Sequence, residues 1–265
     1  MKPENLAWMI RQKCLELSFK KKSSHLGGSL SIADVLAVLY GDVMKVNPKD
    51  PSWEERDRLF YSKGHACMAL YSCLEAMGFY THLVEKFTTD GEVFTSHINH
   101  KVPGVELSTG SLGHALSVAT GVALAGKKKK KDWRAFCIVS DGELDEGSNW
   151  EAILLAPHLK LDNLVLIVDY NKIQSFGMTN DVVNLEPLPA KFDAFNWNVY
   201  QVDGHNFEEI SQVLSNRYQN EKPTVVIAHT IKGKGVSFME NSLEWHYKSP
   251  SEEQYQKALK ELGVL

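Results

Sequence analysis

The residues best suited to chemistry follow two apolar segments in the middle of the chain. Asp141 and Gly142 come directly after the apolar run 136–139, and Asn171 follows a second apolar run at 163–169, with a helical pattern between them. Strands that alternate with helices form parallel sheets, and their carboxyl ends meet at one edge. Carboxylate and amide oxygens, with the main-chain carbonyl of Ile173, are hard ligands that suit Mg²⁺ alongside phosphate and water oxygens. The pattern therefore predicts a cation held against a diphosphate.

An Asp-Gly pair by itself most often marks a turn. Here the pair is followed in order by Glu146-Gly147 and by a second strand ending at Asn171, which favours a binding site over a simple turn. Gly142 would also let the backbone approach a phosphate closely, because glycine carries no side chain.

The elements that must position these residues alternate between strand and helix patterns. We expect an amphipathic helix over 4–22, a loop over 23–28, a second helix opened by a capping box at Ser31–Asp34, and a long irregular segment over 88–113. The remaining expected helices are one that follows residues 62–65 and reaches about residue 77, then 112–125, 146–159, 207–218 (capped by Asn206 with Glu209) and a polar helix near the end. The expected strands are 58–61, 134–139, 163–169, 197–202 and 224–230.

This alternation predicts an α/β fold of three layers, with a mainly parallel sheet covered by helices on both faces. We expect one domain over residues 1–265. Ligands bind beyond the carboxyl ends of the strands in such folds, so the loops after residues 139, 169, 202 and 230 are the expected site.

Composition narrows the class of protein. Apolar residues make up 43% of the 265 residues and charged residues 23%, which is ordinary for a soluble globular protein. The net charge of −4 gives no reason to expect nucleic acid or an anionic membrane as partner. The basic run 127–131 is expected to be a solvated loop. No apolar run reaches the length of a transmembrane helix, and the first residues lack a signal-peptide layout.

The four cysteines, Cys14, Cys67, Cys73 and Cys137, include no Cys-x-x-Cys pair. We interpret them as reduced thiols, and we expect the protein to be cytoplasmic.

Several motifs, in order along the whole chain, resemble those of the transketolase family. Asp141-Gly142 with Asn171 is similar to the thiamine diphosphate motif, with Ser140 at the position of its first glycine. The other motifs are Ser24-His25-Leu26-Gly27, Ser62-Lys63-Gly64-His65-Ala66, Pro103-Gly104-Val105-Glu106, Ser108-Thr109-Gly110-Ser111-Leu112-Gly113, the segment 143–152, and Lys232-Gly233-Lys234-Gly235 with Trp245-His246.

The resemblance implies a thiamine diphosphate-binding fold and roles for particular residues. Asp141, Asn171 and the Ile173 carbonyl would hold Mg²⁺, or Ca²⁺ in its place. Glu146 would link the two cofactor sites of a dimer. The diphosphate and thiazolium side of the cofactor would be lined by Gly110, Ser111, Leu112, Gly142 and Lys232, with His65 and His246 near both the diphosphate and the sugar.

The resemblance also implies that His25 and His97 hydrogen-bond the donor ketose, which suits imidazole because it donates or accepts near neutral pH. His100 lies close to His97, but the spacing to Pro103 favours His97. The remaining histidines are expected to be surface or structural residues: His82, His114, His158 and His205.

Two positions depart from the family pattern. Leu26 follows His25 where the family often has Pro, and Tyr247 follows His246 where the family usually has Gly. We expect both at the mouth of the substrate site, where they would affect the choice of substrate more than the cofactor.

Transketolases place the glutamate that activates the cofactor in a second, pyrimidine-binding domain, and this chain ends at Leu265. The resemblance therefore implies the N-terminal subunit of a split transketolase. With a C-terminal subunit it would form an α2β2 heterotetramer and transfer a two-carbon ketol unit from a ketose or ketose phosphate to an aldose or aldose phosphate. The segment around 104–125 is expected to be buried against other subunits.

Two alternatives stay open at this point. The chain could be the α subunit of another thiamine diphosphate enzyme, such as a 2-oxo acid dehydrogenase, although His25, His65, His97 and His246 fit a polyhydroxylated substrate better. It could instead be a non-catalytic diphosphate-binding module, although every metal and histidine position is filled.

Overall fold

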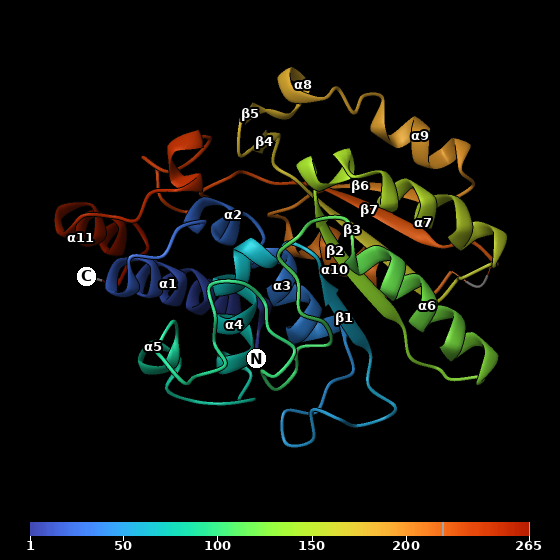
Figure 1. The fold of residues 1–265 in the computed structure, drawn as a ribbon, viewed down its shortest axis with the longest axis horizontal. Helices are drawn as coiled ribbons and strands as arrows, with labels where there is room; N and C mark the ends of the chain where they lie inside the picture. Colours follow the sequence, from blue (N-terminus) through green and yellow to red (C-terminus); the bar gives the residue numbers. More distant parts are fainter. Residues whose placement is uncertain (219, 265) are drawn as a thin grey trace.

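A five-stranded, fully parallel sheet forms the centre of the computed structural model, which describes residues 1–218 and 220–264 (Figure 1). The strand order is β1-β2-β3-β7-β6. The bounds are Arg58–Tyr61 for β1, Ala135–Ser140 for β2, Leu164–Tyr170 for β3, Asn198–Asp203 for β6 and Thr224–His229 for β7. The predicted parallel sheet is confirmed, and each predicted strand lies within one residue of the observed one.

Helices cover both faces of the sheet, because its central strands are apolar on both sides. Phe136 and Ile138 of β2 pack into one core, while Cys137 and Val139 pack into the other. The first core lies under α1 (Pro3–Lys21), α2 (Leu26–Ser31), α3 (Ala33–Val38), α4 (Cys67–Ala76) and α10 (Phe207–Ser215); the second lies under α6 (Ala115–Lys128), α7 (Gly147–His158) and α9 (Leu188–Ala194). The predicted three-layer α/β/α architecture is therefore confirmed.

Short elements connect these layers. They are the π-helical turn η1 (Leu39–Val43), the 3-10 turns η2 (Gly64–Ala66), η3 (Gly142–Asp145) and η4 (Leu243–His246), and the helices α5 (Leu83–Lys86), α8 (Thr179–Val182) and α11 (Glu252–Glu261). The small hairpin of β4 (Ile173–Gln174) and β5 (Gly177–Met178) comes shortly after Asn171. Most of the segment 88–113 is irregular, as expected, and it contains no helix or strand.

Two local predictions fail at the beginning of the chain. The expected loop over 23–28 ends early, because α2 already begins at Leu26. The expected capping box at Ser31 is wrong: the Ser31 hydroxyl donates to Asp169 Oδ2 at 2.7 Å, and the N-cap of α3 is Ile32. A tertiary hydrogen bond to a buried carboxylate replaces the local one.

The ends of other helices also differ from their predicted positions. α6 runs to Lys128, so the basic run begins within a helix rather than in a loop, and Lys127 pairs with Asp162 at 3.1 Å. α10 ends at Ser215, three residues early, whereas its predicted cap is confirmed: Asn206 Oδ1 accepts from the backbone N–H of Glu209 at 3.2 Å.

The four cysteines, all in the described part of the chain, form no disulfide, in agreement with the expected reduced thiols. All four cysteines are free and buried. Among the residues that the structure describes, no helix combines the length and apolar character needed to cross a membrane.

Two glycines of α6 should respond oppositely to a methyl group. Gly121→Ala should stabilise the chain by about 0.5–1 kcal/mol, since a Cβ there meets no heavy atom within 4 Å and alanine favours helix. Gly126→Ala should destabilise it by about 1–2 kcal/mol, because its Cβ would lie 2.5 Å from the Trp133 ring. Urea unfolding measures both effects, and equal shifts would contradict this packing.

Candidate functional site

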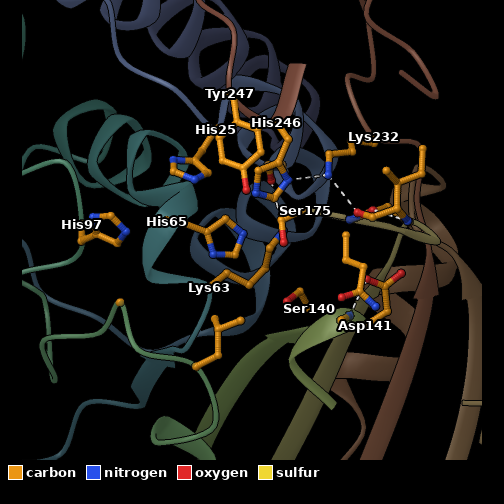
Figure 2. A pocket seen from close by; sticks show the side chains of 17 residues that line it. His25, Lys63, His65, His97, Ser140, Asp141, Ser175, Lys232, His246 and Tyr247 are labelled. Carbon is orange, nitrogen blue, oxygen red and sulfur yellow. Dashed lines mark hydrogen bonds between the residues drawn. The ribbon is translucent and has the colours of Figure 1, made fainter. Parts of the chain in front are cut away.

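A cavity of about 240 Å³ opens at the carboxyl ends of β2 and β3 (Figure 2). It gathers residues from segments that are far apart in the sequence. The lining residues are His25, Gly28, Lys63, His65, His97, Gly110, Leu112, Ser140, Asp141, Gly142, Asn171, Ile173, Gln174, Ser175, Lys232, His246 and Tyr247. The site therefore lies at the edge of the sheet that the strand pattern predicts.

Four imidazoles form one side of the cavity. The His25 ring lies 5.3 Å from His65, 5.9 Å from His97 and 5.1 Å from His246, measured between centroids. His25 precedes α2 in a left-handed backbone conformation (φ 68°), and its N–H donates to the His246 carbonyl at 2.8 Å. This bond ties the beginning of α2 to η4 and holds two of the rings together.

Three of these histidines are uncharged at neutral pH. Burial, followed by the nearby His97 and Lys232, lowers the pKa of His25 to about 4. Burial and Lys232 lower the pKa of His246 to about 3. Burial and Lys63 hold the pKa of His65 well below its usual value. Neutral imidazoles can both donate and accept hydrogen bonds, so this wall can bind hydroxyl groups.

Lys232 joins the histidine wall to the loop after β3. Its Nζ donates to the Ile173 carbonyl at 2.8 Å and to His246 Nδ1 at 2.9 Å. An ammonium group can only donate, so Nδ1 of His246 is the acceptor and Nε2 carries the proton. Burial, with a contribution from Lys63, lowers the pKa of Lys232 to about 8. The lysine therefore places a positively charged donor inside the cavity.

Asp141 occupies the other end of the cavity. Its carboxylate accepts from the backbone N–H groups of Gly142, at 2.8 Å, and of Lys172. Burial, reinforced by the nearby Asp169 carboxylate, raises the pKa of Asp141 to about 6. The next strand brings Asn171, whose Oδ1 accepts from the Ile173 N–H at 3.2 Å. A buried carboxylate beside a second one is short of positive charge, which a bound cation would supply.

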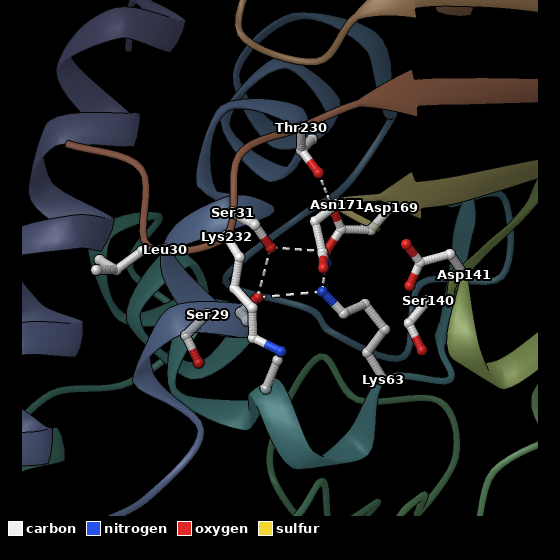
Figure 3. Close-up of polar contacts among 12 residues, drawn as sticks. Ser29, Leu30, Ser31, Lys63, Ser140, Asp141, Asp169, Asn171, Thr230 and Lys232 are labelled. Atoms are coloured by element: carbon white, nitrogen blue, oxygen red, sulfur yellow. Dashed lines mark hydrogen bonds and ion pairs between the residues drawn. The ribbon is translucent and has the colours of Figure 1, made fainter. Parts of the chain in front are cut away.

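A buried ion pair between Lys63 and Asp169 supports both ends of the cavity (Figure 3). The Asp169 carboxylate also accepts from the hydroxyls of Ser31 and Thr230, and Lys63 Nζ donates to the Gly28 carbonyl at 3.1 Å. Burial by itself would raise the pKa of Asp169, but Lys63 and the two hydroxyls lower it, so the carboxylate stays charged. Sequence reasoning missed both charged residues.

Glu143 is a second buried acid that sequence reasoning left without a role. Its side chain accepts from the Gly113 N–H at 2.8 Å and from the Ser62 hydroxyl. These bonds fasten the segment carrying Gly110 and Leu112 to the loop that carries His65. Gly64 is needed at the same junction, because a Cβ there would lie 2.4 Å from the Thr109 carbonyl.

Most of the predicted site residues converge on the cavity. The four histidines line it, as do Asp141, Gly142, Asn171, Ile173, Lys232, Gly110 and Leu112. His97 lies in the cavity, whereas His100 is exposed and bonded to Ser108. Ser111 borders a separate hollow beside Val118, and Glu146 is exposed at the N-cap of α7, so their roles stay predictions.

Tyr247 and Leu26, both expected at the mouth of the substrate site, lie in different places. Tyr247 lines the cavity, but Leu26 is fully buried in the core under α2, so its predicted place at the mouth is wrong. His205 is structural, as expected, because its Nδ1 bonds Asp34 at 2.7 Å and its Nε2 accepts from the Ile231 N–H at 2.8 Å.

Comparison with known proteins gives one consistent family. Residues 4–264 match the family described as "Transketolase, thiamine diphosphate binding domain". One subunit of the apulose-4-phosphate transketolase of Phocaeicola vulgatus is 42% identical over 96% of this chain and 91% of its own length. The 6-deoxy-6-sulfo-D-fructose transketolase subunit SqwG of Clostridium sp. is 42% identical over 98% of this chain and 95% of its length.

Longer proteins match over only part of their length. Transketolase-like protein 2 of Bos taurus is 34% identical over 92% of this chain but 40% of its own length. The crystal structure of transketolase from Campylobacter jejuni superimposes with a TM-score of 0.90 and 34% identity, over 99% of this chain and 42% of that one. Transketolase from Leishmania mexicana gives a TM-score of 0.92 at 30% identity, over 99% and 41%.

Breaking the buried ion pair should be costly. Lys63→Met should lower the free energy of unfolding by about 3–5 kcal/mol, because it leaves the Asp169 charge buried without its partner. Lys131→Met is the matched control and should change stability little, since Lys131 pairs with exposed glutamates. Chemical denaturation measures both variants.

A double variant isolates the interaction itself. Lys63→Met combined with Asp169→Asn should lose clearly less stability than the sum of the two single losses. Simple additivity would show that the two side chains are not an interacting pair.

Proposed function

The chain belongs to the transketolase family, and we propose that it is the thiamine diphosphate-binding subunit of a split transketolase that moves a two-carbon ketol unit from a ketose to an aldose. One observation carries this proposal: neutral histidines suited to sugar hydroxyls share a cavity with a buried carboxylate suited to a metal-bound diphosphate. A wall of imidazoles favours a polyhydroxylated substrate over the 2-oxo acid of the alternative enzyme class.

The lengths of the relatives support the split arrangement. Three relatives whose names describe them as single transketolase subunits match this chain over 91–95% of their own length at 41–42% identity. Transketolase and transketolase-like proteins match over only 37–40% of theirs, at 34–36% identity. We therefore propose a separate C-terminal subunit that carries the pyrimidine-binding domain, with two copies of each chain in an α2β2 heterotetramer.

The residues at the Asp141 end fit a magnesium diphosphate. Asp141, Asn171 and the Ile173 carbonyl would hold Mg²⁺, or Ca²⁺, because all three are hard oxygen donors and the Asp169 carboxylate near the buried Asp141 adds negative charge there. Gly110, Leu112 and Gly142 would line the diphosphate and thiazolium side, with Lys232 supplying positive charge. Once bound, thiamine diphosphate supplies the chemistry that cleaves and forms the carbon–carbon bond.

The chain's own residues bind and orient the sugar. We assign His25 and His97 to hydroxyls or the carbonyl oxygen of the donor, since each imidazole ring offers two nitrogens for hydrogen bonds. Of the four rings, His65 and His246 lie nearer the Asp141 end, where the diphosphate would bind (Figure 2). Lys232 fixes the proton of His246 on Nε2, which makes that nitrogen a hydrogen-bond donor toward a ligand. Ser111 is proposed to line the cofactor, and Glu146 is proposed to link the two cofactor sites of the assembly.

The β4–β5 hairpin offers a surface for the partner subunit. Its base carries Ile173, while Gln174 and Ser175 form part of the cavity rim. Phe176 at its tip is 81% exposed, and Met178 and Val183 beside it are 47% exposed. A subunit that closes the cavity must cross this rim, so we propose that it packs on these apolar side chains. On the segment 104–125, Val118 is exposed and could contact another subunit.

A pull-down tests the assembly directly. The tagged chain, with Mg²⁺ and thiamine diphosphate present, should recover from its native lysate a chain with a pyrimidine-binding domain, and the recovered complex should transfer ketol units. Recovery of lipoyl-bearing proteins would instead assign the chain to the 2-oxo acid dehydrogenases. Recovery of no partner, together with no bound cofactor, would support a non-catalytic module.

Removing the proposed metal ligand should weaken cofactor binding. In the reconstituted complex, Asp141→Ala should raise the apparent Kd for thiamine diphosphate in Mg²⁺ by about 100-fold or more, because direct ligands matter at least as much as the groups that orient them. Asp90→Ala, an exposed carboxylate elsewhere, is the control. Calorimetric titration measures the affinity, and unchanged Mg²⁺-dependent binding would remove the metal assignment.

A charge at the hairpin tip should weaken assembly. Phe176→Asp should reduce affinity for the partner subunit by at least about fivefold, since an aromatic side chain buried at an interface contributes more than about 1 kcal/mol. Trp53→Asp, at an apolar residue that is 37% exposed elsewhere on the surface, should leave affinity unchanged. Analytical ultracentrifugation of the mixed subunits compares them; equal affinities would place the interface elsewhere.

A further inference from the structure

Tyr247 brings an aromatic ring to a cavity wall where the transketolase motif usually has glycine. Its ring centroid lies 4.7 Å from that of His246 and 6.1 Å from that of His25, and the side chain is among those lining the cavity. Figure 2 shows the ring beside these two histidines, with its hydroxyl end directed into the cavity. The residue therefore changes the shape and the chemistry of the substrate side.

The backbone accepts this side chain without strain. Tyr247 has φ −115° and ψ −22°, which any L-residue can adopt, so this turn of the chain does not require glycine. The backbone N–H of Tyr247 donates to the Glu244 carbonyl at 3.3 Å, which fixes where the side chain leaves the main chain. Among the residues that the structure describes, none forms a hydrogen bond with its hydroxyl, so this group is free to bind a ligand.

Tyr247 lies at the mouth of the cavity, because it lines the cavity and yet is 60% exposed. Asp141 and Asn171 lie at the ends of β2 and β3, and Lys232 spans from the Ile173 carbonyl to His246. Tyr247 follows on the far side of His246, away from the carboxylate. A sugar whose reacting end contacts the histidines therefore extends its remaining carbons toward the tyrosine ring.

On these grounds, and resting on the proposed function, we propose that Tyr247 is a specificity-determining residue that closes the outer end of the sugar subsite. Its ring takes up space that longer ketose donors need, and its hydroxyl hydrogen-bonds the donor. Short donors are favoured over long ones as a result. An aromatic ring in place of glycine at this wall fills space that additional carbons of a donor would otherwise enter.

Donor length and the two halves of the side chain can be tested separately. The complex of this chain with its recovered partner is assayed with xylulose 5-phosphate and with sedoheptulose 7-phosphate, two ketoses captured in transketolase crystals from Pichia stipitis. Tyr247→Gly removes the ring and the hydroxyl, and Tyr247→Phe removes the hydroxyl only. Tyr200→Phe, on β6 away from the cavity, is the control.

The expected results differ between the variants. Tyr247→Gly should raise the ratio of kcat/KM for the seven-carbon donor over the five-carbon donor by about tenfold or more, because each extra carbon is worth about 10-fold or more in a confined pocket. Tyr247→Phe should leave that ratio within about twofold and raise KM for both donors by roughly 2–10-fold, the value of one neutral hydrogen bond, with little change in kcat.

Three contrary results would each overturn a different part of the proposal. Suppose that the wild-type complex is active and that Tyr247→Gly and the further variant Tyr247→Ala both keep its melting temperature. An unaltered donor ratio in both variants would then overturn this inference alone. An unchanged KM in Tyr247→Phe would overturn the role of the hydroxyl. A wild-type complex inert with both donors would overturn the proposed function and this inference together.

Discussion

The salt bridge between Lys63 and Asp169 is the constraint on which the rest of the site depends. Both side chains are essentially buried, and their charges are satisfied by each other, by two hydroxyls and by a main-chain carbonyl. The contacts join α2, the turn before His65, β3 and the end of β7. Separating two buried charges would leave each without its partner in a medium that solvates charge poorly. These four segments are therefore held in one arrangement. His25 and His65 keep their spacing because they adjoin two of those segments, α2 and the turn that carries Lys63. Asp141 follows β2, which pairs with β3 along its length and so is held by the same arrangement.

Burial and charge then divide the cavity into two chemically different regions. Around His25, His65 and His246 the cost of burying a charge, together with nearby lysines, keeps the imidazoles neutral. Around Asp141 a buried carboxylate faces a second one, so that region attracts cations. Lys232 lies between the two and bonds to both. One cavity can thus recognise an uncharged polyol at one end and a metal-bound anion at the other.

The sequence allowed the sheet and much of the site to be predicted because both follow local patterns. Asp141 and Asn171 come directly after buried strands, and parallel pairing of β2 with β3 then brings them together without further information. The errors arose where a distant partner decides the local structure. Ser31 was predicted to cap a helix, but its hydroxyl bonds Asp169, a residue 138 positions away. The ion pair was missed for the same reason. Lys63 stands in a polar tetrapeptide typical of a surface loop, and only the fold shows that it pairs with Asp169.

The β4–β5 hairpin joins the Asp141 end of the cavity to an exposed apolar tip within one short segment. The segment from Ile173 to Met178 is two short strands and a turn, so its base and its tip cannot order independently. A protein that binds Phe176 also restricts the position of the Ile173 carbonyl. An ion bound to that carbonyl likewise restricts the position of Phe176. If the two sites are coupled through the hairpin, thermodynamic reciprocity requires that partner and ion each change the affinity of the other by the same factor. A favourable coupling would let the complete assembly hold the ion more tightly than the lone subunit does.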